Sequence, residues 1–495
     1  MEHVDVVVIG AGISGIGMAA HLAMKRPEKK VVILEARESL GGTWDLFRYP
    51  GIRSDSDMVT FGYGWKPWID DRTLADGPSI LAYLREAAHE QGLEPKIRYR
   101  HRVRRASWST ETARWTLDLE VDGAPSRISC DFLLGGTGYY DYARGHRPRF
   151  EDEERFAGTF VHPQEWPADL DYAGKRVVVI GSGATAVTLV PELSKKAAHV
   201  TMLQRSPTYI ARVPSRDRIS RALHRALPTS AAFALSRAKN IGFGLFFYEL
   251  CRRQPERMKR WLVGQVEKEL GPDHDVATHF TPRYAPWDQR LCAVPDGDLF
   301  AAIRGGRASV VTDRIERFTE KGILLGSGRQ LEADIVVTAT GLEVLFLGGI
   351  ELRVDGALVQ PKDKLLYKTM MLEDVPNFVF SFGYTNATWT LKVDLVGEYV
   401  CRLLAQMDAR GVRRCTPRRR PGVREVPFLD FSSGYVQRAL PSLPKQGDAQ
   451  PWRLAMNYLV DAVLIRFGTI DDGTLELATE PPARPAAARP SPAAN

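Results

Sequence analysis

The stretch Gly10-Ala-Gly-Ile-Ser-Gly15 decides the fold of this chain. It follows an apolar segment at Val4–Ile9 and precedes a helix expected through Met18–Met24. In G-x-G-x-x-G spacing, the first glycine permits a tight turn, the second lets a pyrophosphate approach the backbone, and the third lets helix pack on strand. The helix N-terminus then points its dipole at the phosphates. We therefore predict a dinucleotide-binding α/β domain whose loop includes Gly10, Gly12, Ser14 and Gly15.

The residue that ends the next apolar segment indicates which dinucleotide binds. Val31–Leu34 predicts a second strand, and Glu35 follows it 20 residues after Gly15. An acid at this distance is expected to bind the ribose hydroxyls. Because a carboxylate repels a 2′-phosphate, the ligand of this first site is expected to be FAD or NAD rather than NADP.

A second loop repeats the pattern with the opposite charge. Arg176–Ile180 predicts a strand, and His199–Gln204 predicts the next one, which runs into Arg205-Ser206. Arginine suits a phosphate, and this is the position that a 2′-phosphate would occupy. A surface arginine after a strand is the alternative. We expect NADPH to bind at Gly181, Gly183, Ala184, Thr185, Ala186, Arg205 and Ser206.

The two halves share one more pattern. Asp131–Gly138 and Asp334–Gly341 each have an acid, an apolar strand and then small residues that allow backbone close to a cofactor. One nucleotide site has an acid at the ribose position and the other has an arginine there. This pair of sites predicts electron transfer from NADPH to a bound flavin. These residues leave the final electron acceptor open.

Composition excludes several other classes of protein. The chain has 495 residues, of which 44% are hydrophobic and 26% charged, as in ordinary globular proteins. A net charge of +7 without a zinc-finger or helix-turn-helix pattern does not indicate nucleic-acid binding. The five scattered cysteines lack CxxC spacing, which argues against a disulfide framework and a metal site and for a reducing compartment. With no signal peptide or bilayer-length apolar run, we expect a cytoplasmic protein.

Two further stretches contain extended motifs. One is Gly41-Gly-Thr-Trp-Asp-Leu-Phe-Arg-Tyr-Pro-Gly-Ile-Arg-Ser-Asp55. The other matches F-x-G-x-x-x-H-x-x-x-W-P at Phe156, Gly158, His162, Trp166 and Pro167. Together they resemble the two signatures of type I Baeyer–Villiger (class B flavin) monooxygenases. The resemblance extends to about residue 475 and is closest to the ethionamide-activating monooxygenase subgroup. It adds five residues to the expected FAD site: Gly42, Thr43, Trp44, Tyr49 and Asp55.

The resemblance also implies a reaction. NADPH would reduce FAD, O2 would form a C4a-peroxyflavin, and a ketone would become an ester or lactone, with sulfides or thioamides as further substrates. Arg290 would stabilise the anionic peroxide and the anionic adduct with the ketone, and Asp55 would hold this arginine in place. The alternative is that Arg290 and Asp55 form only a solvent-exposed ion pair. Many members have Lys before this arginine to help hold the NADP phosphate. Here Gln289 stands there, so Arg205 and Ser206 would take more of the 2′-phosphate.

His162 and Trp166 directly precede Pro163 and Pro167, and these prolines prevent a regular helix. By its residues alone the stretch is an ordered linker between two nucleotide domains. The family resemblance implies a hinge that moves as the cofactor shifts position, and we assign no catalysis to this histidine.

We therefore expect an α/β flavoprotein with two Rossmann-like domains and an inserted helical subdomain that caps the substrate cleft. The insertion's basic, amphipathic helices also permit peripheral membrane contact. The oligomeric state stays open. The expected boundaries are an FAD-binding domain at 1–143 and 375–479, an NADPH-binding domain at 144–212 and 283–374, a helical insertion at 213–282, and a disordered Pro/Ala-rich tail at 480–495.

Three other functions fit some of these features. A flavin-containing monooxygenase that oxidises only nitrogen or sulfur is the nearest alternative. A disulfide reductase would need a redox CxxC or Cx4C pair beside the first site, and this chain has none there. An NADPH-binding sensor without enzymatic activity is the third.

Overall fold

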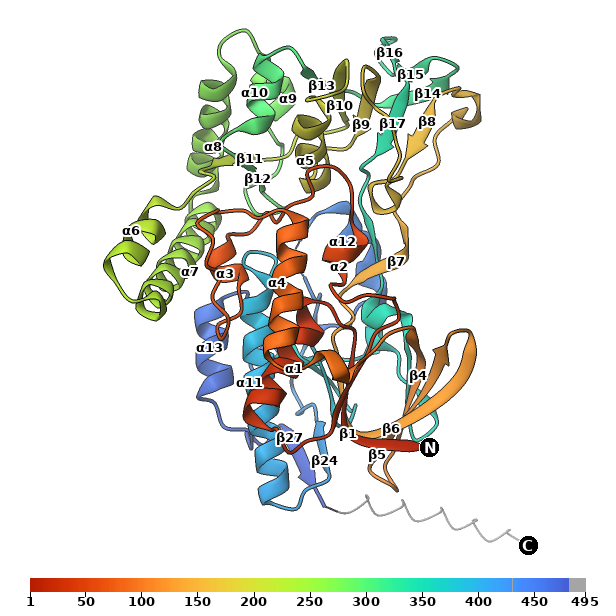
Figure 1. Cartoon of the computed structure of the whole chain (residues 1–495), viewed down its shortest axis with the longest axis vertical. Coiled ribbons are helices and arrows are strands. Elements are labelled where there is room, and N and C mark those ends of the chain that lie inside the picture. Colours follow the sequence, from red (N-terminus) through yellow and green to blue (C-terminus); the bar gives the residue numbers. More distant parts are fainter. Residues whose placement is uncertain (430, 480–495) are drawn as a thin grey trace, which may run out of the picture.

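The computed structural model describes residues 1–429 and 431–479, which form two α/β domains with a helical insertion (Figure 1). The predicted fold class is thereby confirmed. The predicted tail at 480–495 lies outside the described residues.

The first domain is built on a nine-stranded sheet. Its strand order is β20-β19-β4-β5-β6-β1-β2-β3, and β23 pairs with the free half of the long strand β6. Strand β1 pairs in parallel with β2 and with β6, which places the loop after β1 at the carboxyl edge of the sheet. The strands are β1 (Glu2–Ile9), β2 (Val31–Leu34), β3 (Ile97–Arg98), β4 (His101–Ser109), β5 (Arg114–Val121), β6 (Ala124–Gly135), β19 (Glu351–Val354), β20 (Ala357–Leu358) and β23 (Phe378–Phe380).

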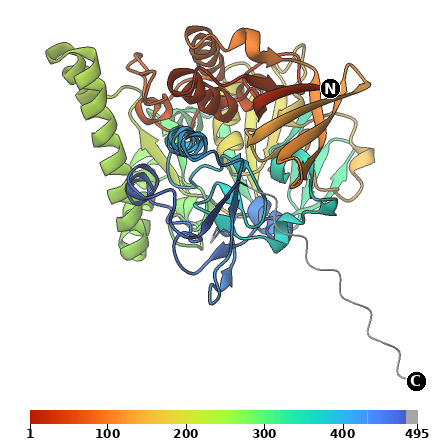
Figure 2. The same ribbon diagram turned by 90° about the horizontal axis from the view of Figure 1, so that it is seen from below.

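Helices from both ends of the chain cover this sheet. Helix α1 (Ile13–Lys25) packs against α11 (Trp389–Ala409) and α4 (Gly77–Glu90), and α11 packs in turn against α13 (Tyr458–Arg466). Figure 2 shows these helices bundled beside the sheet. The glycine loop after β1 therefore lies against the segment that returns to this domain more than 350 residues later, and the site is assembled only when the whole chain has folded.

The second domain is a smaller parallel sheet with the strand order β13-β10-β9-β17-β8. The predicted strands coincide with β9 (Arg176–Ile180) and β10 (His199–Gln204). The other members of the sheet and its covering helices are β8 (Thr159–Val161), β13 (Ala308–Thr312), β17 (Ile335–Thr338), α5 (Ala184–Leu193), α9 (Val276–Phe280) and α10 (Asp298–Arg304). A small antiparallel sheet follows, made of β14 (Ile315–Thr319), β15 (Gly322–Leu325) and β16 (Gln330–Glu332).

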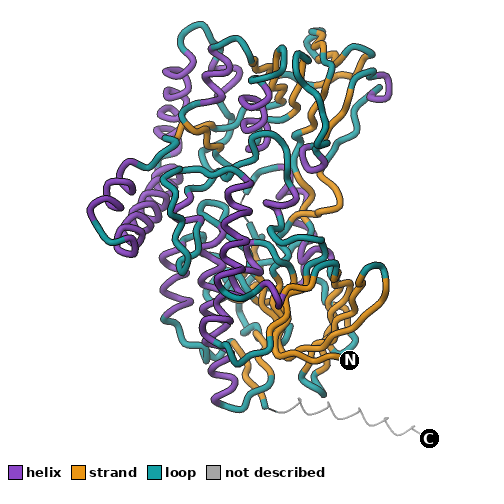
Figure 3. The backbone as a smooth tube through the Cα atoms, viewed as in Figure 1, coloured by secondary structure: helices purple, strands orange, loops and turns teal. Residues whose placement is uncertain are grey.

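Two short antiparallel strands, β7 (Tyr140–Gly145) and β18 (Leu342–Val344), connect the domains (Figures 1 and 3). The return to the first domain differs from the expected boundary at 374. Strand β19 already pairs with β4, and Leu352 is buried in the first domain's core. The sequence of β19 is too short to show periodicity, so its pairing partner could not be read from pattern alone.

The predicted insertion is helical and protrudes from one side of the molecule (Figure 1). It contains α6 (Arg218–Ala226), α7 (Thr229–Arg253) and α8 (Pro255–Leu270). Helix α8 packs on the second domain through α10, whereas α7 packs against α3 (Met58–Phe61) of the first. The insertion belongs to the second domain in sequence, but it also packs against the first domain.

We predict that Gly15→Ala lowers stability by about 3 kcal/mol, because overpacking of a tight core site costs roughly this much. A Cβ at residue 15 would lie 1.7 Å from the carbonyl oxygen of Gly10. Gly183→Ala is the matched control in the second loop, since a Cβ there meets no atom within 4 Å. Urea unfolding of both variants checks the difference, and equal midpoints would contradict this packing argument.

Candidate dinucleotide sites and interdomain pocket

The first glycine loop forms a cradle in which Gly10 and Gly15 have no room for a side chain. Gly10 has a φ of +96°, and a Cβ there would lie 2.6 Å from the carbonyl oxygen of Gly136. Gly12 begins α1 without a side-chain cap, and the first turn of the helix has no acidic residue. The N-terminal amides of α1 are thus left without a side-chain acceptor, as an anion-binding helix start requires. These features fit the pyrophosphate of a dinucleotide.

Glu35 lies where the sequence places it, at the end of β2 and beside this cradle. Its carboxylate accepts hydrogen bonds from the backbone N–H groups of Ala11 at 2.8 Å and Arg37 at 2.9 Å. Both bonds fix the negative charge next to the glycine loop. This position supports the predicted preference for a ribose without a 2′-phosphate.

The Gly41–Asp55 signature folds back onto the same loop. Gly42 begins the short helix α2 (Thr43–Leu46) with a φ of +56°, and a Cβ there would lie 3.0 Å from the Cα of Gly12. Thr43 Oγ1 lies 3.3 Å from the hydroxyl of Tyr142 on β7, and the Trp44 ring packs edge-on against Phe61. The signature thus brings Gly42 against the first cradle, and Thr43 and Trp44 follow it directly in α2.

Tyr49 differs from the expectation. Instead of lining the first cradle, its ring is buried with Phe47 in the core of the second domain. Burial raises the pKa of Tyr49 to about 12, while a hydrogen bond with Thr185 of the second loop opposes the shift. The segment that contains Tyr49 therefore joins the first domain to the second nucleotide loop.

Ser14 connects the first cradle to the returning chain. Its Oγ accepts a hydrogen bond of 2.7 Å from the indole N–H of Trp389, the first residue of α11. The Trp389 ring in turn stacks on Tyr139 at 5.1 Å between centroids. The sequence indicated Ser14 but gave no signal for these two aromatic rings.

The second loop has the same construction but is more open. Gly181 has a φ of +136° and lies tightly against Ala339, whereas Gly183 and Ala184 are exposed. Helix α5 also begins without a side-chain cap or an acidic residue in its first turn. Ala186 is buried, and Arg205 and Ser206 are exposed at the end of β10. This arrangement fits a dinucleotide that binds and leaves across the surface.

Arg290 and Asp55 form an ion pair between the two domains. The Arg290 Nε and one terminal nitrogen donate to the two Asp55 oxygens, each at 2.8 Å. The other terminal nitrogen donates to the carbonyl oxygen of Thr385 at 2.7 Å. Although burial opposes it, the Asp55 carboxylate raises the pKa of Arg290, so the guanidinium stays charged. The two residues paired by the sequence analysis are therefore in direct contact.

Aromatic side chains surround this ion pair. The Trp287 ring lies 6.0 Å from the Arg290 guanidinium carbon, and the Trp287 backbone has a φ of +72°. Such a backbone is strained for a bulky residue, and strain of this kind gathers at functional sites. Burial raises the pKa of Tyr139 and of Tyr435 on α12 (Gly434–Ala439), which keeps both hydroxyls protonated near the arginine.

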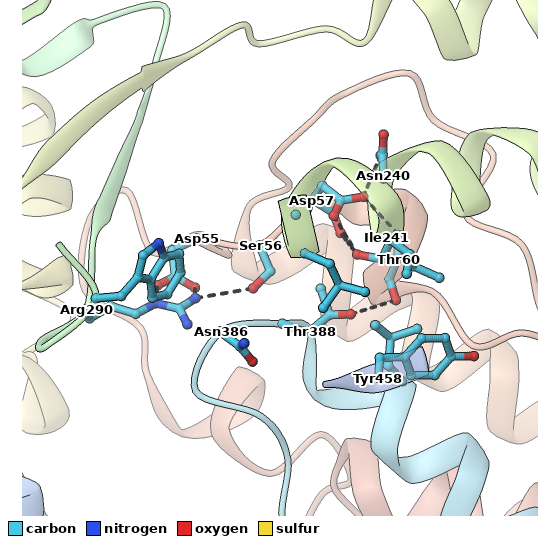
Figure 4. Close-up of a pocket in the computed structure, with 15 residues that line it drawn as sticks. Asp55, Ser56, Asp57, Thr60, Asn240, Ile241, Arg290, Asn386, Thr388 and Tyr458 are labelled. Atoms are coloured by element: carbon cyan, nitrogen blue, oxygen red, sulfur yellow. Dashed lines mark hydrogen bonds and ion pairs between the residues drawn. The ribbon is translucent and has the colours of Figure 1, made fainter. Parts of the chain in front are cut away.

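A cavity of about 130 Å³ opens beside the pair, between the two domains and the insertion (Figure 4). A cavity of roughly 150 Å³ can hold a benzene ring, so this one has room for a small substrate group. One wall is polar: Asn386 Nδ2 donates to the Met456 carbonyl, and its Oδ1 has no hydrogen-bond partner among the described residues. The lining residues that sequence reasoning missed are Ser56, Asp57, Thr60, Asn240, Ile241, Gly244, Leu245, Trp287, Asn386, Ala387, Thr388, Leu391 and Tyr458.

Polar contacts join helix α7 to α3 and to Asp394 beside the cavity. Arg237 donates to the carbonyl oxygens of Val59 and Gly62 at 3.0 and 2.6 Å and contacts the buried Asp394 carboxylate. One turn later, Asn240 donates to Asp57, which also caps the N-terminus of α3. The insertion therefore sets the position of the short helix that follows Asp55.

The stretch Phe156–Pro167 is more than a linker, because Thr159–Val161 is strand β8 at the edge of the second sheet. Phe156 is buried in that domain's core, and Gly158 lies against the backbone of Asp334. His162 packs closely on Gly145 of β7, because a Cβ at residue 145 would lie 1.8 Å from the His162 imidazole. His162 Nδ1 accepts from the Gln164 N–H, and Trp166 packs edge-on against Tyr172. These contacts place the stretch at the interdomain connection and away from the Arg290 cavity lining.

Comparison with known proteins now identifies the family. The flavin-binding monooxygenase-like model matches residues 70–375, and an NAD(P)-binding Rossmann-like domain matches residues 8–71. The FAD-containing monooxygenase EthA of Mycobacterium tuberculosis is 52% identical over 97% of this chain and 99% of its own. The chain belongs to the flavin-binding monooxygenase family.

Solved structures show the same fold. A steroid monooxygenase bound to NADP covers 96% of this chain and 99% of its own, with a TM-score of 0.73 and 21% identity. A cyclohexanone monooxygenase bound to ε-caprolactone covers 97% and 100%, with a TM-score of 0.72 and 18% identity. These structures confirm the fold, while the family model and the match to EthA confirm the resemblance at the level of the family.

Within the described residues, no group of three or more His, Cys, Asp or Glu side chains could hold a metal ion. No helix in the same part of the chain is both long and apolar enough to span a bilayer. Gln289 lies two residues after the strained Trp287, in the loop before β12 (Cys292–Pro295), and its role at the NADP phosphate stays a prediction.

We predict that His162→Asn makes the protein less sensitive to acid. Burial lowers the pKa of His162 below its usual 6.5, so the unfolded chain binds the proton more readily. Stability is therefore lost as the pH falls below about 6.5. Asn keeps an acceptor for the Gln164 N–H but does not titrate. Urea unfolding at pH 7.5 and 5.5 checks this, and an unchanged pH dependence would contradict it.

The exposed His89 provides a control of opposite sign. A hydrogen bond with Glu94 raises the pKa of His89, so its contribution to stability is present at low pH and is lost as the pH rises. His89→Asn should therefore make the variant slightly more sensitive to acid.

Proposed function

We propose that this flavin-binding monooxygenase uses FAD, NADPH and O2 to convert apolar ketones to esters or lactones, and that it also oxidises sulfides or thioamides. The observation that carries the proposal is the Arg290–Asp55 pair at the edge of a small cavity that is lined by both domains and the insertion. The balanced reaction takes ketone, O2, NADPH and a proton to ester, NADP⁺ and water. The matches to a caprolactone-bound and a steroid monooxygenase support it at the level of the fold.

The two cradles would take different cofactors. The first, with Glu35 at its rim, would hold FAD, and the second, with Arg205 and Ser206, would hold NADPH. When bound, the reduced flavin supplies the oxygen-activating chemistry. Five buried cysteines without disulfides among the described residues support a reducing compartment such as the cytoplasm.

The chain's own contribution is a positive charge held in a fixed orientation at a partly buried site. Arg290 is held from three sides, by both Asp55 oxygens and by the Thr385 carbonyl. A guanidinium held in this way stabilises the negative oxygen that develops when a nucleophile adds to a carbonyl. Asp55 orients the arginine and partly neutralises it, so the site holds an anion without trapping it.

We predict that Arg290→Gln separates NADPH oxidation from product formation. NADPH should still be consumed, because the cradles are intact. Ester formation from phenylacetone should fall by roughly 10²-fold or more, as when one charge-stabilising donor is lost. Product mass and NADPH absorbance, followed together, measure the two rates.

Asp55→Asn is the partner variant, and its amide oxygen keeps one acceptor for the guanidinium. The fall in ester formation should therefore be smaller in Asp55→Asn than in Arg290→Gln. Wild-type turnover of thioanisole to its sulfoxide without any ester from ketones would favour a monooxygenase of nitrogen and sulfur only. NADPH oxidation and product formation that both match the wild type in Arg290→Gln would contradict the role given to this pair.

We predict that Arg205→Ala raises the KM for NADPH by about tenfold, which corresponds to the loss of one charge-assisted contact. The KM for NADH is the internal control, because NADH has no 2′-phosphate for Arg205 to contact. Initial rates with both nucleotides check this. A parallel rise in both KM values would show that Arg205 supports the loop rather than the phosphate.

A further inference from the structure

Exposed apolar side chains are concentrated on one part of the surface. Among the described residues, 13 large hydrophobic side chains are exposed, and nine of them belong to α6, α7, α8, α13 or the residue after α13. Contiguous patches of this kind mark interaction sites, whereas single exposed hydrophobics need no explanation. We call the exposed side of α7 and α13 the apolar face.

Helix α7 has polar side chains on its inner side and apolar side chains on its solvent side. A surface helix normally turns its charged side to solvent. Here Arg237 points inward to Asp394 and backbone carbonyls. Phe243 and Phe246 point outward, with 67% and 64% of their surfaces exposed. Leu235 lies 11 residues before Phe246, which places the two on the same side of the helix.

Helix α13 continues the apolar face. Leu459, Val463 and Phe467 follow at intervals of four residues and form one exposed stripe, with Phe467 80% exposed. The inner side of α13 supplies Tyr458 to the cavity, and the inner side of α7 supplies Ile241. Figure 4 shows these two side chains at the same end of the cavity. The apolar face therefore lies directly behind one wall of the proposed substrate site.

Charge indicates what covers this face. Residues 218–270 contain 11 Lys and Arg against four Asp and Glu, an excess of seven that equals the net charge of the whole chain. Arg257 and Arg260 are exposed on α8 beside Trp261, whose ring packs against Phe247 of α7. A second copy of this segment would carry the same positive excess and be repelled. An anionic surface would be attracted.

We propose that the apolar face docks on the surface of an anionic lipid bilayer, with Phe243, Phe246, Val463 and Phe467 inserted at the headgroup boundary. Basic residues of α6 and α8 contact the lipid phosphates. The mode is interfacial, as for amphipathic helices that lie in the plane of a membrane. One consequence rests on the proposed function: apolar substrates dissolved in the bilayer reach the cavity from the side of α7 and α13.

Vesicle flotation of the full chain tests the docking without substrate or NADPH, so its outcome is independent of the reaction. The wild type should float with vesicles of phosphatidylcholine and 30% phosphatidylglycerol, but only weakly with pure phosphatidylcholine. Binding should weaken in 1 M NaCl, because salt screens the attraction to the headgroups. Phe243→Ser/Phe246→Ser and Val463→Ser/Phe467→Ser should each reduce binding by about tenfold or more.

Two controls match these changes elsewhere on the surface. Leu358→Ser removes an exposed apolar side chain on β20, at the far edge of the first sheet, and should leave binding unchanged. Arg257→Gln/Arg260→Gln should weaken binding to anionic vesicles but not to pure phosphatidylcholine. Arg102→Gln on β4 should leave binding to both kinds of vesicle unchanged. Circular dichroism confirms that each variant is folded.

Several results would overturn the proposal. One is a wild type that does not float with anionic vesicles, and another is equal loss in Leu358→Ser and the α7 variant. A third is a dimer in light scattering that Phe243→Ser/Phe246→Ser converts to a monomer, because the face would then bind a second copy of the chain.

Discussion

The contact between Arg290 and Asp55 is the interaction on which the arrangement of the two domains depends. Asp55 belongs to the first domain, Arg290 to the second, and the Thr385 carbonyl to the returning segment. A charged pair that is partly removed from water is favourable only when its hydrogen bonds are complete. Separation of the domains would break these bonds at once, so the pair favours one relative position of the two cradles.

The covalent connection between the domains is slight, and the insertion compensates for it. Strands β7 and β18 form a narrow ribbon, and His162 fills the space above Gly145 at its end. Helix α7 adds a second link, through Arg237 and Asn240. The two domains are thus joined by a narrow ribbon and by polar contacts of one helix, an arrangement that is compatible with domain motion during catalysis.

Local patterns predicted much of this structure, because they are dictated by local chemistry. The two glycine loops, the strands at β2, β9 and β10 and the helices of the insertion all follow from spacing within about 30 residues. The Arg290–Asp55 contact came from resemblance to a family, since no local pattern joins residues 235 positions apart. The return through β19, the burial of Tyr49 and the cavity wall of Asn240 and Tyr458 depend on tertiary packing, which no short stretch specifies.

Helix α7 shows a deeper limit of pattern reading. Its apolar periodicity correctly predicts a helix, but periodicity alone does not say which side faces inward. The buried side needs Arg237 and Asn240, because the carbonyls that end α3 and the carboxylates of Asp394 and Asp57 would otherwise be left without donors. Once those polar groups turn inward, the helical repeat forces Leu235, Phe243 and Phe246 outward. The exposed apolar face is therefore a direct consequence of how the helix closes the cavity.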